Sequence, residues 1–132
     1  MSYATPWTRS DPDGIPTATT DLIVSRLPTN KPIALTGVDG SVLLFVNPVE
    51  ALPAGGAVLD SGEPSLTVPI VVTGSNRCDG HALSDSKKTY EFQAQVSIGD
   101  ADPVGTNLSV SAADRPLLNQ VIVDTCGTDH HR

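Results

Sequence analysis

The stretch Tyr-Glu-Phe-Gln-Ala-Gln-Val-Ser-Ile, residues 90–98, decides the fold class of this chain. Its apolar residues alternate strictly with polar ones, so an extended strand would have one apolar face and one polar face. A register shift of one residue would bury the polar set, so the alternation also determines which face is buried. We therefore predict a half-buried β-strand. Its core-facing residues are Tyr90, Phe92, Ala94, Val96 and Ile98.

The composition of the whole chain also favours β structure. Val, Ile and Thr together account for 33 of the 132 residues, and these β-branched residues fit a pleated sheet better than a helix. Eleven prolines and eleven glycines interrupt almost every stretch and exclude long helices. Aromatic residues make up only 4% of the chain, so the core must consist mainly of Val, Leu and Ile.

Further strands are predicted on both sides of this segment. Residues 99–103 form a hairpin connection, from which 104–110 returns. Residues 66–73 are a strand with a free edge or a bulge at Pro69, because proline cannot donate a ladder hydrogen bond. The run 41–46 is apolar on both faces and is predicted as a central strand. The other predictions are a strand at 21–27, a turn at 37–40 and a brief pairing at 57–59.

The last predicted element is a short helix near the C-terminus. Asp114 suits the N-cap, Pro116 is tolerated in a first turn, and Gly127 suits a helix stop. A strand at 120–125 is the competing interpretation, because this run is rich in β-branched residues. The spacing i, i+3, i+4, i+7 favours the helix. The residues with this spacing are Leu118, Val121, Ile122 and Thr125.

Short strands separated by turns predict an immunoglobulin-like antiparallel β-sandwich with a short C-terminal helix. A small β-barrel is the alternative, and the Cys…Trp…Cys pattern of antibody-type domains is absent. The domain is expected to span residues 21–127. Residues 1–20 are predicted as an extended arm or linker that Trp7 attaches to the body, and residues 128–132 as a disordered tail.

The charge balance excludes several classes of function. The chain has 8 basic and 15 acidic residues and a formal net charge of −7. A nucleic-acid partner is not expected, because its phosphates require a concentrated basic patch. No apolar run approaches the roughly 20 residues of a transmembrane helix. The segment after Met1 does not read as a signal peptide, but a mature or excised form would also lack one, so this does not argue for the cytoplasm.

The two cysteines give the most specific chemical signal. Cys78 and Cys126 each follow a predicted regular element and stand 48 positions apart. Their even number and placement predict a disulfide and an oxidising, extracytoplasmic compartment. Two unpaired thiols are the alternative. On the chain-entropy model, closing such a loop contributes about 4 kcal/mol.

Metal binding is a weaker interpretation of the same residues. Cys78 with His81, and Cys126 with His130, have the short spacing of zinc ligand pairs. The histidines at 130 and 131 lie in the predicted tail, however, and a real site needs ordered ligands. We therefore predict no metal site and no cofactor.

His81 is the only histidine outside the tail. Asp79 and Asp85 flank it, so a hydrolytic or metal-dependent enzyme centred on His81 is one alternative. The other interpretation is a loop histidine that bonds nearby backbone. The sequence has no nucleophile elbow and no phosphate-binding glycine loop. We assign no catalytic residue, and we predict that the protein is not an enzyme.

The polar loop 74–88 is the candidate recognition surface, because loops on a rigid scaffold commonly carry recognition. Its candidate contacts are Arg77, Asp79, His81, Lys87 and Lys88. The alternative is that Arg77 and Asp79 only brace the turn that holds the disulfide.

This loop also carries a resemblance. The run Arg77-Cys78-Asp79-Gly80-His81-Ala82, followed by a lysine, Tyr90, Phe92 and the late Cys126, resembles a group of actinobacterial extracytoplasmic proteins, most of them uncharacterised and secreted or lipid-anchored. That group often has proline where Gly80 stands here. The resemblance covers roughly residues 66–127, implies the same compartment, supports the cysteine pairing and implies no catalytic role. We expect a non-enzymatic binding or accessory module of the cell envelope, anchored, if at all, outside this chain. A structural or assembly domain is the alternative.

Overall fold

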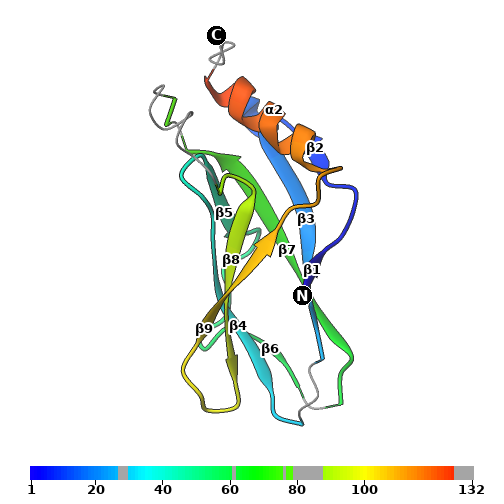
Figure 1. The fold of residues 1–132 in the computed structure, drawn as a ribbon. Helices are drawn as coiled ribbons and strands as arrows, with labels where there is room; N and C mark the ends of the chain where they lie inside the picture. Colours follow the sequence, from blue (N-terminus) through cyan, green and yellow to red (C-terminus); the bar gives the residue numbers. More distant parts are fainter. Residues whose placement is uncertain (27–29, 61, 76, 79–87, 127–132) are drawn as a thin grey trace.

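The computed structural model describes residues 1–26, 30–60, 62–75, 77–78 and 88–126. This part of the chain forms two antiparallel sheets and one C-terminal α-helix (Figure 1). The predicted mainly β character, the antiparallel pairing and the short C-terminal helix are thus confirmed.

The first sheet has the strand order β1–β3–β7–β5, and β2 also pairs with β3. Its central pair is β3 with β7, in which all nine residues of β3 have a partner, from Thr17 opposite Thr73 to Ser25 opposite Ser65. A short 3-10 turn, η1 (Pro12–Gly14), separates β2 from β3. The strands are β1 (Ser2–Tyr3), β2 (Thr8–Ser10), β3 (Thr17–Ser25), β5 (Leu44–Pro48) and β7 (Ser65–Gly74).

The second sheet has the strand order β6–β4–β8–β9. The predicted hairpin after residue 98 is confirmed, because β8 pairs with β9 in antiparallel register from Glu91 opposite Ser109 to Val96 opposite Val104. The predicted brief pairing at 57–59 is confirmed as an edge strand. The strands are β4 (Ile33–Asp39), β6 (Ala57–Leu59), β8 (Glu91–Ile98) and β9 (Val104–Ser109).

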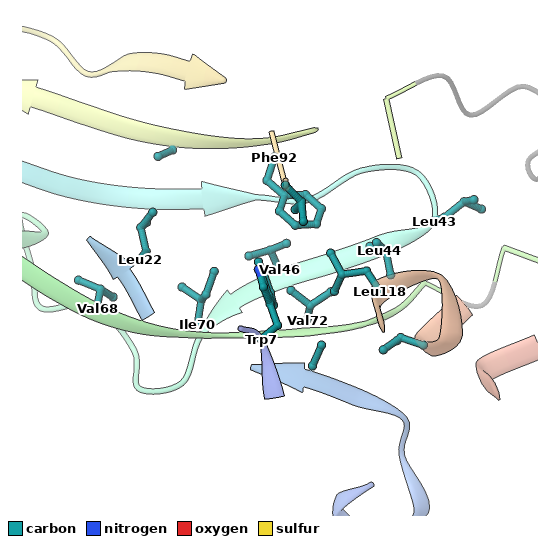
Figure 2. Close-up of a cluster of buried hydrophobic side chains, with 14 of the residues drawn as sticks. Trp7, Leu22, Leu43, Leu44, Val46, Val68, Ile70, Val72, Phe92 and Leu118 are labelled. Carbon is teal, nitrogen blue, oxygen red and sulfur yellow. The ribbon is translucent and has the colours of Figure 1, made fainter. Parts of the chain in front are cut away.

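The main hydrophobic core lies between the two sheets and includes side chains from both (Figure 2). The alternation that decides the fold class is confirmed, because Phe92 and Ala94 are each only 3% exposed. They pack in one cluster with Leu22 of β3 and Val72 of β7. A smaller cluster of Val24, Ile33 and Leu59 continues the core toward the other end of the sheets.

Strand β4 was not predicted from the sequence, which indicated a turn at 37–40. In the structure β4 runs through Gly37 to Asp39, with a β-bulge between Leu35 and Gly37. A bulge places two residues opposite one and so reverses the alternation of faces. The period-2 pattern therefore stops at the bulge, although the strand continues.

The predicted central strand at 41–46 is wrong in its position and in its range. The strand is β5, and it forms an edge of the first sheet. Leu44 and Val46 are buried, but Phe45 is 52% exposed. An apolar residue on each face is therefore not enough to identify a central strand.

Pro69 lies in β7, between β3 and β5, at the point where β5 has ended. The last ladder pair with β5 is Pro48 opposite Ile70, and the amide of Val49 then donates to the carbonyl of Pro69 at 3.0 Å. The N and O of one strand residue point to the same side. The nitrogen of Pro69 therefore faces Val49 and not β3, so the missing N–H leaves the β3–β7 ladder intact and ends the ladder with β5.

Residues 1–20 are not an isolated arm in the structure. β1 and β2 both lie within this segment and pair with β3, which begins at Thr17 and not at residue 21. Trp7 is 3% exposed, and its ring centroid lies 5.3 Å from that of Tyr3 and 6.5 Å from that of Phe92. Burial of this one large side chain attaches the segment to the core.

The C-terminal helix α2 (Arg115–Cys126) begins after Asp114, as predicted. Leu118, Val121 and Ile122 are its buried residues, and they belong to the main core. The helix contacts β3 and β7 and lies across one end of the sheets (Figure 1). Its apolar face therefore closes that end of the core.

The two phenylalanines provide a matched test of this arrangement. We expect Phe92→Ala to lower the free energy of unfolding by about 3–5 kcal/mol, because it leaves a cavity between the sheets. Phe45→Ala removes the same atoms from an exposed position and should cost less than about 1 kcal/mol. Urea unfolding measures both. Equal losses, or a loss below about 1 kcal/mol for Phe92→Ala, would contradict this core.

Candidate functional site

Cys78 and Cys126 form a disulfide, with 5.6 Å between their Cα atoms. The predicted pairing is confirmed, and the alternative of two unpaired thiols is wrong. The bond joins the segment that follows β7 to the last residue of α2. Cys126 also packs against the main core. A disulfide is consistent with an extracytoplasmic location.

Only part of the predicted recognition loop belongs to the described residues. Arg77 and Lys88 are described and are both exposed. At the start of the loop, the hydroxyl of Ser75 donates to the carbonyl of Val42 at 2.5 Å and accepts from the amide of Arg77 at 3.4 Å. Four further candidate residues of the loop and one of the tail lie outside the described residues: Asp79, His81, Asp85, Lys87 and His130.

No group of three or more His, Cys, Asp or Glu side chains in the part of the chain that the structure describes is placed to hold a metal ion. No helix in the same ranges has the length and apolar character needed to cross a membrane.

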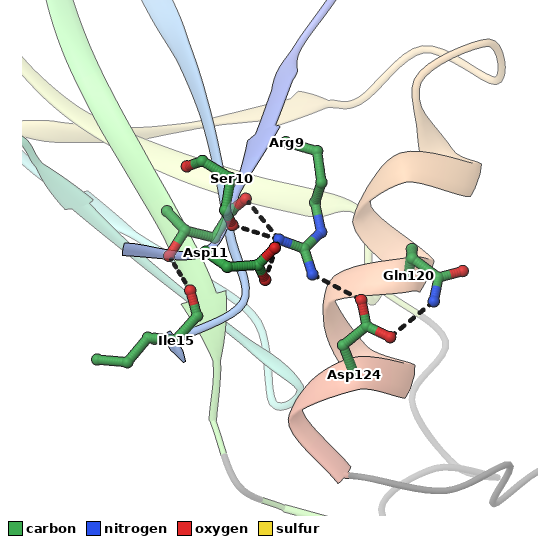
Figure 3. A network of polar contacts seen from close by, with 7 residues as sticks. Arg9, Ser10, Asp11, Ile15, Gln120 and Asp124 are labelled. Carbon is green, nitrogen blue, oxygen red and sulfur yellow. Dashed lines mark hydrogen bonds and ion pairs between the residues drawn. The ribbon is translucent and has the colours of Figure 1, made fainter. Parts of the chain in front are cut away.

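A polar cluster of the described residues joins β2 to α2 (Figure 3). The guanidinium of Arg9 donates to Asp11 at 2.8 Å and to Asp124 at 2.6 Å. The amide of Gln120 donates to the other oxygen of Asp124 at 2.7 Å. The hydrogen bond from Arg9 lowers the pKa of Asp124 below its ordinary value. This pairing stabilises the contact between the N-terminal segment and the helix, so we interpret the cluster as structural.

A groove lies between the two sheets at the end opposite α2. Its volume is about 380 Å³. The opposite placement follows from the register, since Thr125 of α2 packs against Gly74 of β7, whereas the groove reaches the far end of β3 at Val24 and Ser25. The apolar lining includes Val24 of β3, Ile33 of β4, Val96 and Ile98 of β8, and Val104 of β9.

The groove begins where the aromatic side chains end. Nearer to α2, Tyr3 fills the space between the sheets, and its hydroxyl donates to the carbonyl of Leu108 at 2.8 Å. This hydrogen bond connects β1 of the first sheet to β9 of the second. Burial raises the pKa of Tyr3. Beyond Leu108 the facing side chains are Thr106 and Val104, which are too short to reach across.

The alternation of β9 did not predict the groove. Val104 and Thr106 lie on the side of the strand that lines it, yet Val104 is 65% exposed. Its side chain is exposed because it borders an open groove and not a filled core. The low aromatic content is the one related signal in the sequence, and it does not indicate where the space remains.

Comparison with known proteins yields no match. The chain fits no family model, and neither a curated protein nor a solved structure is significantly similar to it. The resemblance to actinobacterial extracytoplasmic proteins therefore stays a prediction. The disulfide and the groove are the grounds on which a function can be argued.

The contribution of the disulfide can be measured directly. In the native oxidised protein we expect no titratable thiol, and reductant should lower the free energy of unfolding by about 2–4 kcal/mol, because the unfolded chain loses its cross-link. The double variant Cys78→Ser, Cys126→Ser should have the same reduced stability and should not respond to reductant. Two free thiols in the oxidised protein would contradict the bond.

The ion pair between Arg9 and Asp124 predicts a dependence of stability on pH. Because the pKa of Asp124 is lowered in the folded protein, its contribution is complete above the unfolded value of about 3.9 and is lost as the pH falls through the lower folded value. Both side chains are partly exposed, so Asp124→Asn should cost less than about 1 kcal/mol at pH 7. The loss of unfolding free energy caused by Asp124→Asn should become smaller below pH 3, because Asp124 of the wild type is then increasingly protonated.

Asp21→Asn is the matched control for this variant, because Asp21 is an exposed carboxylate on β3. We expect it to leave the unfolding free energy nearly unchanged at both pH values. Urea unfolding at pH 7 and pH 2.5 measures the two variants beside the wild type. An Asp124→Asn cost that is as large at pH 2.5 as at pH 7 would contradict the assigned ion pair.

Proposed function

We propose that this chain is a non-enzymatic, extracytoplasmic binding or accessory module of the cell envelope, built on an immunoglobulin-like β-sandwich. The observation that carries the proposal is the apolar groove between β3 and β9. The groove is the ligand site in this proposal. The disulfide and α2 hold the opposite end of the two sheets together.

The immunoglobulin-like type is supported by the order of the strands. In a constant-type immunoglobulin domain, the strands in chain order A to G form one sheet ABED and a second sheet CFG. If β1 and β2 together count as A, the order β1–β3–β7–β5 corresponds to ABED, and β4–β8–β9 corresponds to CFG. Strand β6 is an addition beside β4. The disulfide joins other elements than the B–F bond of antibody domains.

The extracytoplasmic location is supported by the Cys78–Cys126 bond. Structural disulfides persist in oxidising compartments and are rare where cellular reductants act. The bond fixes the start of the 74–88 loop, so this loop remains a second candidate surface for recognition. It begins beside the end of α2, at the opposite end of the molecule from the groove.

The binding role is supported by the size and lining of the groove. Ligand sites are usually concave, mostly apolar and largely formed before binding, with volumes from about 300 Å³ upward. The groove has about 380 Å³. Its polar groups are few and include Asp102, Thr106 and Ser25. Such a site favours an apolar ligand group with a small number of hydrogen-bonding or cationic atoms.

A structural or assembly role is the second candidate, and the edge strand β5 favours it. The residues from 40 to 49 carry no charge. Phe45 and Val49 are 52% and 56% exposed on this edge. Uncharged edge strands with exposed apolar residues readily pair with other chains. The residues of the alternative enzyme centred on His81 lie outside the described residues, and metal analysis of the purified protein tests that alternative.

The groove can be tested with a neutral apolar probe. N-phenyl-1-naphthylamine fluoresces more strongly when it enters an apolar site, and we expect saturable binding with one site per chain. Val104→Lys places an ammonium group at the groove and should weaken binding about tenfold, as about 1.4 kcal/mol implies. Val58→Lys is the matched control, because Val58 is 44% exposed on edge strand β6 of the same sheet.

Binding that is unchanged in Val104→Lys, or equally weakened in both variants, would contradict the groove as the ligand site. Both positions are exposed, so both variants are expected to fold. Thermal unfolding of each variant confirms this before the probe is added.

A further inference from the structure

We propose that the groove binds an extended peptide segment of another protein, which adds as a strand to the free edge of β9 and places alternate apolar side chains between the sheets. The peptide carries a basic residue at the end that lies beside the 99–103 hairpin. This inference rests on the proposed binding function and specifies the class of its ligand.

The first ground is the backbone of β9. The amide of Val110 donates to the carbonyl of Tyr90 at 2.8 Å, and the β8–β9 register continues from this pair. In an antiparallel ladder, alternate residues direct both backbone groups to the same neighbour. Gly105, Asn107 and Ser109 therefore direct their N–H and C=O groups away from β8. No other described strand pairs with this edge.

The second ground is the position of the groove relative to that edge. The side chains of Val104 and Thr106 line the groove, so the inner face of β9 opens onto it. A strand that pairs with β9 would lie in the same sheet, roughly 5 Å further out, with every second side chain on the inner face. Those side chains would enter the groove. Backbone pairing would supply affinity, and the groove would select the side chains.

The third ground is charge. Asp102 lines the groove, and Asp100 lies in the same hairpin before β9. Lys31 packs against Gly99 of this hairpin, so two acidic groups stand near one basic group. The chain as a whole carries −7. Complementary charge therefore favours a peptide that ends in Lys or Arg at this side.

Charge also favours a basic peptide over a second copy of the chain as the partner of β9. In a symmetric dimer through β9, the partner strand would be the same uncharged segment, and residues 103–113 contain no basic residue. Two chains of charge −7 would meet, and the partner's β9 would bring no further cation to the acidic hairpin. A strand from another protein, with apolar side chains and a basic end, would pair with the backbone groups of β9 and bring a cation to the acidic hairpin.

The test uses a labelled peptide of the sequence Lys-Val-Thr-Val-Thr-Val-Lys with blocked ends. Two derivatives are N-methylated, one on the three valines and one on the two threonines, which removes N–H donors and keeps the side chains. A third derivative has Glu in place of both Lys. Fluorescence anisotropy measures binding to the wild-type protein and to Val104→Lys, with Val58→Lys as the matched control.

We expect the parent peptide to bind wild type and Val58→Lys alike, and Val104→Lys at least tenfold more weakly. At least one N-methylated peptide should bind at least tenfold more weakly, because N-methylation blocks the pairing. The Glu peptide should also bind more weakly, by a factor that falls as salt is raised. In NMR spectra, the peptide should slow hydrogen exchange at Gly105 and Asn107.

Three outcomes would overturn the proposal in distinguishable ways. If the neutral apolar probe binds but both N-methylated peptides bind as tightly as the parent, the groove is a ligand site and strand addition is wrong. If neither the probe nor any peptide binds, the proposed function fails as well. If sedimentation shows a dimer that Val104→Lys dissociates and Val58→Lys does not, the occupant is a second copy.

Discussion

The space between the two sheets has to be filled, and this chain has few large side chains with which to fill it. It contains five aromatic residues: one Trp, two Tyr and two Phe. Tyr3, Trp7 and Phe92 meet in one cluster. Tyr90 lies beside α2, where its hydroxyl donates to Asn119. The remaining one, Phe45, is exposed. The aromatic volume is thus concentrated in the half of the core nearer to α2.

The consequences at the two ends of the molecule are opposite. At the α2 end, the apolar helix face, the disulfide and the Arg9–Asp124 pair hold the N-terminal strands, the first sheet and the helix together. At the other end, valine and isoleucine line the space, and a groove remains. Stability and the candidate site are therefore separated along the strands. Substitutions at the groove mouth therefore lie far from the contacts that close the other end of the fold.

The groove also coincides with an exposed edge. Natural sheets usually protect their edges with charged residues, proline or a covering segment, because unpaired backbone groups attract other strands. The β9 strand has no charged residue and no proline within Val104–Ser109. The groove lies beside its unpaired edge. The hairpin that precedes β9 carries Asp100 and Asp102. The same backbone groups that would be a liability elsewhere are here beside a volume that can accept side chains.

Local patterns in the sequence were sufficient for several parts of this structure. The alternation over residues 90–98 predicted the buried face of β8, because side chains of a strand alternate with a period of two. The spacing of Leu118, Val121 and Ile122 predicted the buried face of α2, because helical residues recur every 3.6 positions. The positions of the two cysteines at the ends of predicted elements predicted their bond.

Other features depend on which segments meet in space, and no local pattern carries that information. The bulge in β4 interrupts the alternation of its side chains. The edge position of β5 depends on the order of the strands in the sheet. The N-terminal segment forms two strands beside β3, and Trp7 of this segment is buried in the core. The groove is the clearest case. Its existence depends on whether side chains from two sheets and from β1 reach one another. That is a matter of distances between residues far apart in the chain, which only the tertiary packing decides.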